Sequence, residues 1–75
     1  MTRAYLKIWT KTGSEGNVRK QLLDIQGVEM ADLTAGEQDL MAVVEADTYE
    51  DLLQIVVGEI RRLPGVERTV TSLAL

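Results

Sequence analysis

Side chains that could act as an acid, a base or a nucleophile are few in this chain. The sequence has no histidine and no cysteine, so it lacks the commonest general base, the thiol nucleophile and the usual zinc ligands. An enzyme would have to depend on Glu37, Asp39 or Tyr49, and no nucleophile stands beside a base among them. We therefore expect no catalytic residue, no metal site and no cofactor.

The charge of the chain argues against direct binding to nucleic acid. Eight basic and twelve acidic residues give a formal net charge of −4, whereas autonomous nucleic-acid binders carry a basic stripe. The closest candidate for such a stripe is Arg61-Arg62 with Arg68 nearby. Arg61 and Arg62 fall in the last turn of a predicted helix, where cations complement the helix dipole. We interpret them as helix-end residues.

The length of 75 residues allows one domain and favours self-association. A chain this short buries only about 60% of the surface that its unfolded form exposes, and without cysteine or histidine the remaining route to stability is association. No apolar run approaches the roughly 20 residues of a membrane span, and no signal peptide precedes the first strand pattern. We expect a single domain over residues 1–75, in the cytoplasm and without membrane contact.

One helix-to-strand junction occurs twice. Gly27 and Gly65 each close a helical pattern and are followed at once by a strand pattern, because glycine adopts the left-handed conformation that ends a helix at little cost. Ser14 and Thr48 are the expected N-caps of the two helices. Gly58 lies inside the second helical pattern, where it costs about 1 kcal/mol relative to alanine. A close helix crossing would explain this glycine.

The elements follow the order β-α-β-β-α-β. Apolar residues recur at every second position in the strand segments and at about every 3.6 positions in the helical segments. This order predicts an α+β fold of the ferredoxin-like split βαβ type. The expected strands span residues 4–10, 28–33, 39–46 and 66–75, and the expected helices follow Ser14 and Thr48 and end at Gly27 and Leu63.

The strands are apolar on both sides. Two helices can cover only one face of the sheet, yet Tyr5, Trp9, Met41 and Val43 belong to the other face. A half-solvated sheet alternates apolar with polar residues, and an exposed apolar patch marks an interface. We predict a two-fold dimer whose sheets pack face to face through these four residues.

Three stretches, residues 25–28, 34–47 and 60–71, resemble one known family. The most specific pieces are the Gly36-x-x-Asp39-Leu40 turn and the run Pro64-Gly65-Val66-x-Arg68-Thr69-x-Thr71. They are similar to the effector-binding and oligomerisation (RAM) domain of the leucine-responsive/AsnC (Lrp/AsnC) family of transcriptional regulators. Full-length members place a helix-turn-helix domain before this one, so the chain resembles the stand-alone versions of the domain.

The resemblance implies a dimeric α+β barrel, rings built from such dimers, and an amino acid or related effector bound between dimers. The turn that bears Gly36, Glu37 and Asp39 matches the family's ligand-contacting loop. Thr69 and Thr71 match strand positions that contact the ligand across the interface. These residue types fit an amino acid as ligand. Backbone N–H groups near a glycine can bind its carboxylate, an aspartate can pair with its ammonium, and hydroxyl groups can hydrogen-bond to either.

Alternatives to this function and to these site roles remain. Gly36 also suits turn geometry, Asp39 also suits a cap at the strand end, and both threonines are good strand residues. Ala35 stands where the family usually has threonine, and Gln38 where it usually has an aromatic residue. A passive assembly partner of full-length regulators, with no ligand of its own, is one alternative function. A cofactor-free enzyme of the small dimeric α+β barrel type is another.

Overall fold

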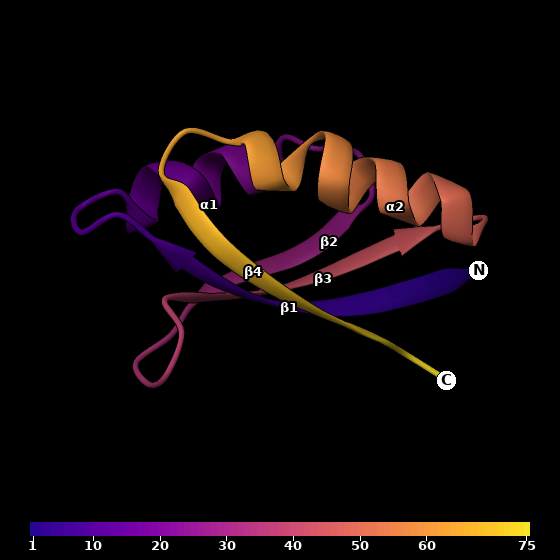
Figure 1. Cartoon of the computed structure of the whole chain (residues 1–75), viewed down its shortest axis with the longest axis horizontal. Coiled ribbons are helices and arrows are strands. Elements are labelled where there is room, and N and C mark those ends of the chain that lie inside the picture. The colour runs from indigo at the N-terminus through magenta and orange to yellow at the C-terminus, as the bar shows by residue number, and fades with distance from the viewer.

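The computed structural model describes the whole chain, residues 1–75. Four strands form one antiparallel sheet in the order β2-β3-β1-β4, and both helices lie on the same face of it (Figure 1). The predicted ferredoxin-like βαββαβ fold is confirmed. In chain order the elements are β1 (Thr2–Thr10), α1 (Glu15–Leu23), β2 (Val28–Leu33), β3 (Leu40–Ala46), α2 (Tyr49–Gly58), the 3₁₀ turn η1 (Ile60–Arg62) and β4 (Val66–Leu73).

The hydrophobic core lies between the helices and one face of the sheet. Side chains alternate across each strand, so one set from the central strands β1 and β3 is fully buried and the other set points to the uncovered side, here called the open face. The helices complete the core with one apolar stripe each. The buried residues are Ala4, Leu6, Ile8, Val18, Leu22, Ala31, Leu40, Ala42, Val44, Leu52, Val56 and Ile60.

Helix α1 begins after Ser14 as predicted, but its capping hydrogen bond and its end differ from the prediction. Ser14 occupies the N-cap position but makes no capping hydrogen bond through its side chain; the Glu15 carboxylate instead accepts one from the Gly13 N–H at 2.7 Å. The helix ends at Leu23, short of Gly27, because the next two N–H groups bond to carbonyls three residues back, which tightens the last turn. The predicted cap chemistry at Ser14 is therefore wrong.

Helix α2 begins where the sequence predicted and is shorter than predicted. Thr48 caps it by accepting a hydrogen bond from the Asp51 N–H at 3.1 Å. The helix ends at Gly58 and gives way to η1, so the prediction of one helix through Leu63 was too long. An added Cβ at Gly58 would meet nothing within 4 Å, which excludes a close helix crossing within the protomer. Neither helix is long and apolar enough to cross a membrane.

The two glycine junctions hold the halves of the fold against each other. Gly27 has φ +103° and Gly65 has φ +95°, the region that glycine adopts without strain. A Cβ at Gly27 would lie 2.6 Å from the Ile55 Cδ1 atom and 3.0 Å from the Glu45 carbonyl oxygen; one at Gly65 would lie 3.0 Å from Ser14 Cβ. Each junction therefore packs against the other βαβ unit, and its missing side chain permits the approach.

We predict that Gly27→Ala destabilises the protein by about 1–3 kcal/mol, because alanine would be strained at this φ and would collide with Ile55. Gly58→Ala is the matched control: it meets no neighbour and removes a poor helix former, so it should be neutral or stabilise by up to about 1 kcal/mol. Urea unfolding followed by circular dichroism measures both. Equal effects of the two changes would contradict the packing role of Gly27.

Candidate functional site

The loop between β2 and β3, residues 34–39, is closed by its own hydrogen bonds. The Thr34 N–H donates to the Asp39 carbonyl at 3.0 Å, and the Thr34 hydroxyl donates to the Gln38 carbonyl at 2.9 Å. Gly36 lies at the exposed tip, has no positive φ, and has open space where a Cβ would be. Backbone strain therefore does not require glycine there, so the turn-geometry alternative loses its main support.

Asp39 fastens this loop to the end of β1. Its Oδ2 atom accepts hydrogen bonds from the Thr10 N–H at 2.8 Å and the Thr10 hydroxyl at 3.4 Å. Its own N–H donates to the Ile8 carbonyl at 3.0 Å. Thr10 is almost fully buried, so its N–H needs this acceptor. Asp39 thus caps the strand end, while its Oδ1 atom accepts no hydrogen bond within the protomer.

Glu37 joins the loop to the open face of the sheet. Its carbonyl accepts a hydrogen bond from Trp9 Nε1 at 3.0 Å, and its carboxylate pairs with Lys7 Nζ at 3.1 Å. The Arg68 guanidinium lies 4.6 Å from the centre of the Trp9 ring, a cation–π contact. Sequence reasoning missed Lys7 and Arg68 as neighbours of the loop. Lys7 could have been predicted, because it lies two residues from Trp9 and therefore on the same side of β1. Arg68 could not, because its position beside Trp9 depends on how β4 pairs with β1.

The other two predicted ligand residues lie elsewhere. Thr69 and Thr71 line a groove of about 350 Å³ between β4 and α2, together with Leu53, Val57 and Arg61. This groove is on the helix side of the sheet, whereas Glu37 contacts the open face. Within one protomer the structure therefore does not bring the threonines together with the loop.

The four predicted interface residues share the open face. Tyr5 lies opposite Val43 in the β1–β3 register, and Met41 lies opposite Lys7 between Tyr5 and Trp9. Tyr5 is 40% exposed and the other three are half-buried. All four lie on the two central strands, with the charged Lys7 between Tyr5 and Trp9 along β1.

Arg3 and Glu45 form a second ion pair on the open face, at the end of the sheet away from the loop. A hydrogen bond with Tyr5, followed by the hydrogen bond and charge of Glu45, raises the pKa of Arg3 above its usual value. The Arg3 pair lies at one end of the open face, whereas Lys7 pairs with Glu37 from the middle of that face, between Tyr5 and Trp9.

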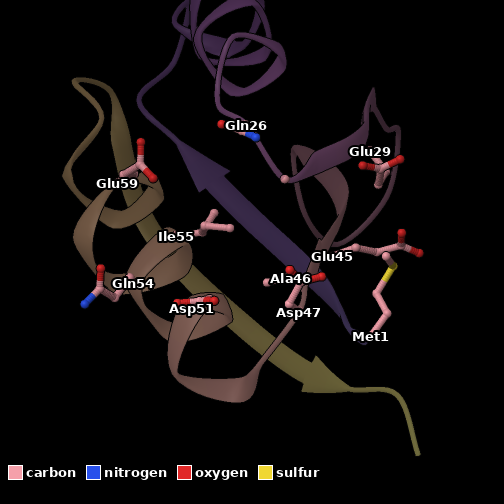
Figure 2. Close-up of a pocket in the computed structure, with 11 residues that line it drawn as sticks. Met1, Gln26, Glu29, Glu45, Ala46, Asp47, Asp51, Gln54, Ile55 and Glu59 are labelled. Atoms are coloured by element: carbon pink, nitrogen blue, oxygen red, sulfur yellow. The ribbon is translucent and has the colours of Figure 1, made fainter.

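An acidic cavity, which the sequence did not predict, lies between α2, the end of β3 and the turn at Gly27 (Figure 2). Its volume is about 540 Å³ and no lysine or arginine lines it. The field of its carboxylates disfavours an anionic ligand, and no group of acidic side chains there is placed to hold a metal ion. The acidic lining residues are Glu29, Glu45, Asp47, Asp51 and Glu59.

The candidate catalytic residues do not form a group. Glu37 contacts Lys7 and Trp9, Asp39 contacts Thr10, and Tyr49 lies on α2 in the groove lined by Thr69. No nucleophile is held by a base among them, which is the geometry that covalent catalysis requires. The enzyme alternative gains no support from this arrangement.

Comparison with protein families and with solved structures identifies the same kind of domain. Residues 3–75 match the model of the Lrp/AsnC ligand binding domain. The chain is similar to the hypothetical protein PHS023 from Pyrococcus horikoshii, with 36% identity, a TM-score of 0.94, and coverage of 100% of this chain and 90% of that one. It is also similar to FFRP-DM1, with 36% identity, a TM-score of 0.96 and full coverage of both chains. A search of curated proteins found no match.

A longer regulator shares the fold. The transcriptional regulator NMB0573 from Neisseria meningitidis, solved as a complex with L-Met, has a TM-score of 0.85 at 13% identity. The match covers 99% of this chain and 49% of the regulator. The family match over residues 3–75 shows that the chain belongs to the Lrp/AsnC ligand-binding domain family.

Proposed function

We propose that this chain is a self-assembling sensor module for transcriptional regulation, which binds an amino acid and catalyses no reaction. The observation that carries the proposal is the match of residues 3–75 to a ligand-binding domain of regulators. In this proposal the sensor touches DNA only through a partner, such as a full-length Lrp/AsnC-type regulator.

The chemistry of the loop at residues 34–39 supports an amino acid as effector. Asp39 keeps one carboxylate oxygen, Oδ1, without a partner, and this atom can accept a hydrogen bond from an ammonium group. The exposed backbone at Gly36 leaves room for a carboxylate to approach its N–H groups. The related regulator NMB0573 was solved with L-Met, which is an amino acid.

The division of the predicted ligand residues supports a site between subunits. Glu37 contacts the open face, and Thr69 and Thr71 line the groove on the helix side. Glu37 and the two threonines thus face opposite sides of the sheet in one protomer. If both contribute, the loop of one copy and the β4 strand of another must form the site, and effector binding then depends on assembly.

The open face supports the dimer on which this assembly rests. Tyr5, Trp9, Met41 and Val43 form one apolar surface that neither helix covers. Only 13 of the 75 residues are buried in the protomer, as expected of a domain that gains burial by association. We propose that a second copy covers this surface. The resulting dimer either stands alone or forms one unit of a larger ring.

A ligand-free assembly partner is the second candidate, and one observation favours it. The Gln38 side chain stands where the family usually has an aromatic residue, and its Nε2 atom donates to the Thr34 hydroxyl within the loop at 3.3 Å. The amide therefore contributes to closure of the loop rather than presenting an aromatic wall to a ligand. Such a partner would join the oligomers of full-length regulators without sensing.

We predict that a thermal-shift screen against the common amino acids finds a stabilising ligand. A ligand at about 100 times its dissociation constant adds about 2.7 kcal/mol of stability. Light scattering on the same samples should show that the oligomer changes with the same ligand. An unresponsive protein that instead captures a full-length regulator would favour the assembly-partner candidate.

We predict that Asp39→Asn removes the response to the ligand and leaves the fold intact. The asparagine oxygen can still accept the Thr10 N–H, but the charge that pairs with an ammonium is gone. Asp39→Ala is the comparison: it leaves the buried Thr10 N–H without an acceptor and should cost about 1–3 kcal/mol of stability. Full ligand response in the asparagine variant would place the effector elsewhere.

We predict that Val43→Glu splits the dimer, because it puts an unpaired charge at the centre of the interface. Leu23→Glu is the matched control, since Leu23 is exposed at the end of α1, on the other side of the molecule and away from the groove lined by Thr69. Sedimentation velocity at micromolar concentration measures the mass of each variant, and circular dichroism checks the fold. A dimer that tolerates Val43→Glu as well as Leu23→Glu would refute the open-face interface.

A further inference from the structure

The groove between α2 and β4 exists because α2 does not fully cover the edge strand. Thr69 and Thr71 of β4 lie opposite Ile8 and Leu6 of β1 in the sheet register. Ile8 and Leu6 are fully buried, whereas Thr69 is half-buried and Thr71 is exposed. Since neighbouring strands lie only about 4.8 Å apart, the cover over the sheet ends between β1 and β4. Helix α2 packs over β1 and β3 and leaves the groove open along its side.

The exposed side of α2 makes one wall of this groove apolar. Leu52 and Val56 are buried in the core, and the residue after each of them, Leu53 and Val57, is exposed and lines the groove. Tyr49, one turn before Leu53, is also exposed and lines the same groove. Positions i, i+4 and i+8 lie on one side of a helix, so the three exposed residues form one apolar stripe. A stripe of this kind beside a cavity indicates a surface that binds another apolar group.

Arg61 is the one charged residue that lines the groove. Ile60, directly before it, is fully buried and anchors the 3₁₀ turn η1, which holds Arg61 in this place. Arg61 forms no ion pair in the protomer. Arg61 and Thr69 also line a small cavity of about 220 Å³, to which Arg68 adds a second cation and Glu67 an anion. The groove therefore combines an apolar wall with an unpaired guanidinium and a hydroxyl.

We propose that this groove binds an L-amino acid with an aliphatic side chain, whose carboxylate pairs with Arg61 and whose side chain lies against Leu53 and Val57. This rests on the proposed function and deepens it, because it names the class of effector and a residue that determines specificity. A planar guanidinium matches a carboxylate with two parallel hydrogen bonds. The groove volume of about 350 Å³ is near the lower end of the range for small-molecule pockets, about 300–1,000 Å³, which suits a ligand as small as an amino acid.

The proposed site divides the charges of the ligand between two copies of the chain. Asp39 of one copy pairs with the ammonium, and Arg61 of the other pairs with the carboxylate, which has further lone pairs for the backbone near Gly36. A ligand with a charged side chain would place that charge against the apolar wall of α2, where it loses hydration without gaining a partner. The groove therefore favours aliphatic amino acids over acidic and basic ones.

A ligand series tests the class of effector. Isothermal titration calorimetry of the natural chain compares the aliphatic L-amino acids valine, leucine, isoleucine and methionine with aspartate and lysine. We expect the tightest binder to be aliphatic, and its carboxamide, which lacks the carboxylate charge, to bind roughly tenfold or more weakly. A tightest binder with a charged side chain, or a carboxamide that binds as well as its acid, would overturn the proposal.

Arg61→Gln tests the residue. We expect the variant to bind the aliphatic amino acid roughly tenfold or more weakly and to change binding of the carboxamide much less, so that the preference for the acid disappears. A merely structural role would weaken both ligands equally. Arg62→Gln is the matched control, because Arg62 is the next residue of η1, is exposed, and lines neither the groove nor the small cavity. A preference for the acid that survives in Arg61→Gln would overturn the role of Arg61.

Val57→Asn tests the apolar wall and the occupant of the groove. This neutral change removes apolar surface, so we expect weaker binding of the aliphatic amino acid with an unchanged circular dichroism spectrum. Leu23→Asn is the control, because Leu23 is equally exposed on a helix and does not line the groove. If Val57→Asn instead binds the amino acid normally and its oligomer dissociates in sedimentation velocity, a second copy occupies the groove and the proposal is overturned.

These outcomes separate the proposed function from its extension. If no amino acid binds the natural chain, both are overturned. If an amino acid binds and Arg61→Gln keeps the preference for the acid, Arg61 is not the partner of the carboxylate. In that case the amino-acid sensor of the proposed function stands.

Discussion

The structure depends on one constraint: two short helices can cover only one face of a four-stranded sheet. The central strands β1 and β3 are apolar on both sides, so the covered side forms the core and the other side stays open. The buried side needs no partner, since its residues are fully enclosed by α1 and α2. The open face carries the apolar side chains of Tyr5 and Met41 at its centre, together with Lys7, and further charges toward its margins. Burial of that surface is favourable only through association, and this is the physical reason for the self-assembly that we propose.

The loop at residues 34–39 is connected to the same open face. Glu37 binds Trp9 and Lys7, and Asp39 binds the end of β1. A ligand that moved or stiffened this loop would therefore act directly on side chains of the open face. Thr69 lies on the other side of the sheet, in the groove beside α2. If the proposed effector binding and assembly both occur, they would affect each other, since both would depend on the same few contacts.

Helix caps and other local features were predictable from the sequence where only neighbouring residues determine them. The Thr48 cap formed as expected because its oxygen and the Asp51 N–H are three residues apart. At Ser14 an equally local prediction was wrong, since Glu15 reaches back to the Gly13 N–H instead. Gly58 marked the end of α2 rather than a helix crossing, and the apolar stripe that continues beyond it belongs to η1 and its flanks. Periodicity reports which side faces the core, and it does not report where an α-helix tightens into a 3₁₀ turn.

The sequence by itself determined the order of elements, the two faces of each strand and the two glycine junctions, because periodicity and backbone freedom act over a few residues. It also carried the family, through the run at residues 60–71 and the Gly36 turn. Only the tertiary structure decided that Thr69 and Glu37 lie on opposite sides of the sheet, and that Arg68 stacks on Trp9. The physical reason is that such neighbours depend on strand order and register, which bring together residues far apart in the chain.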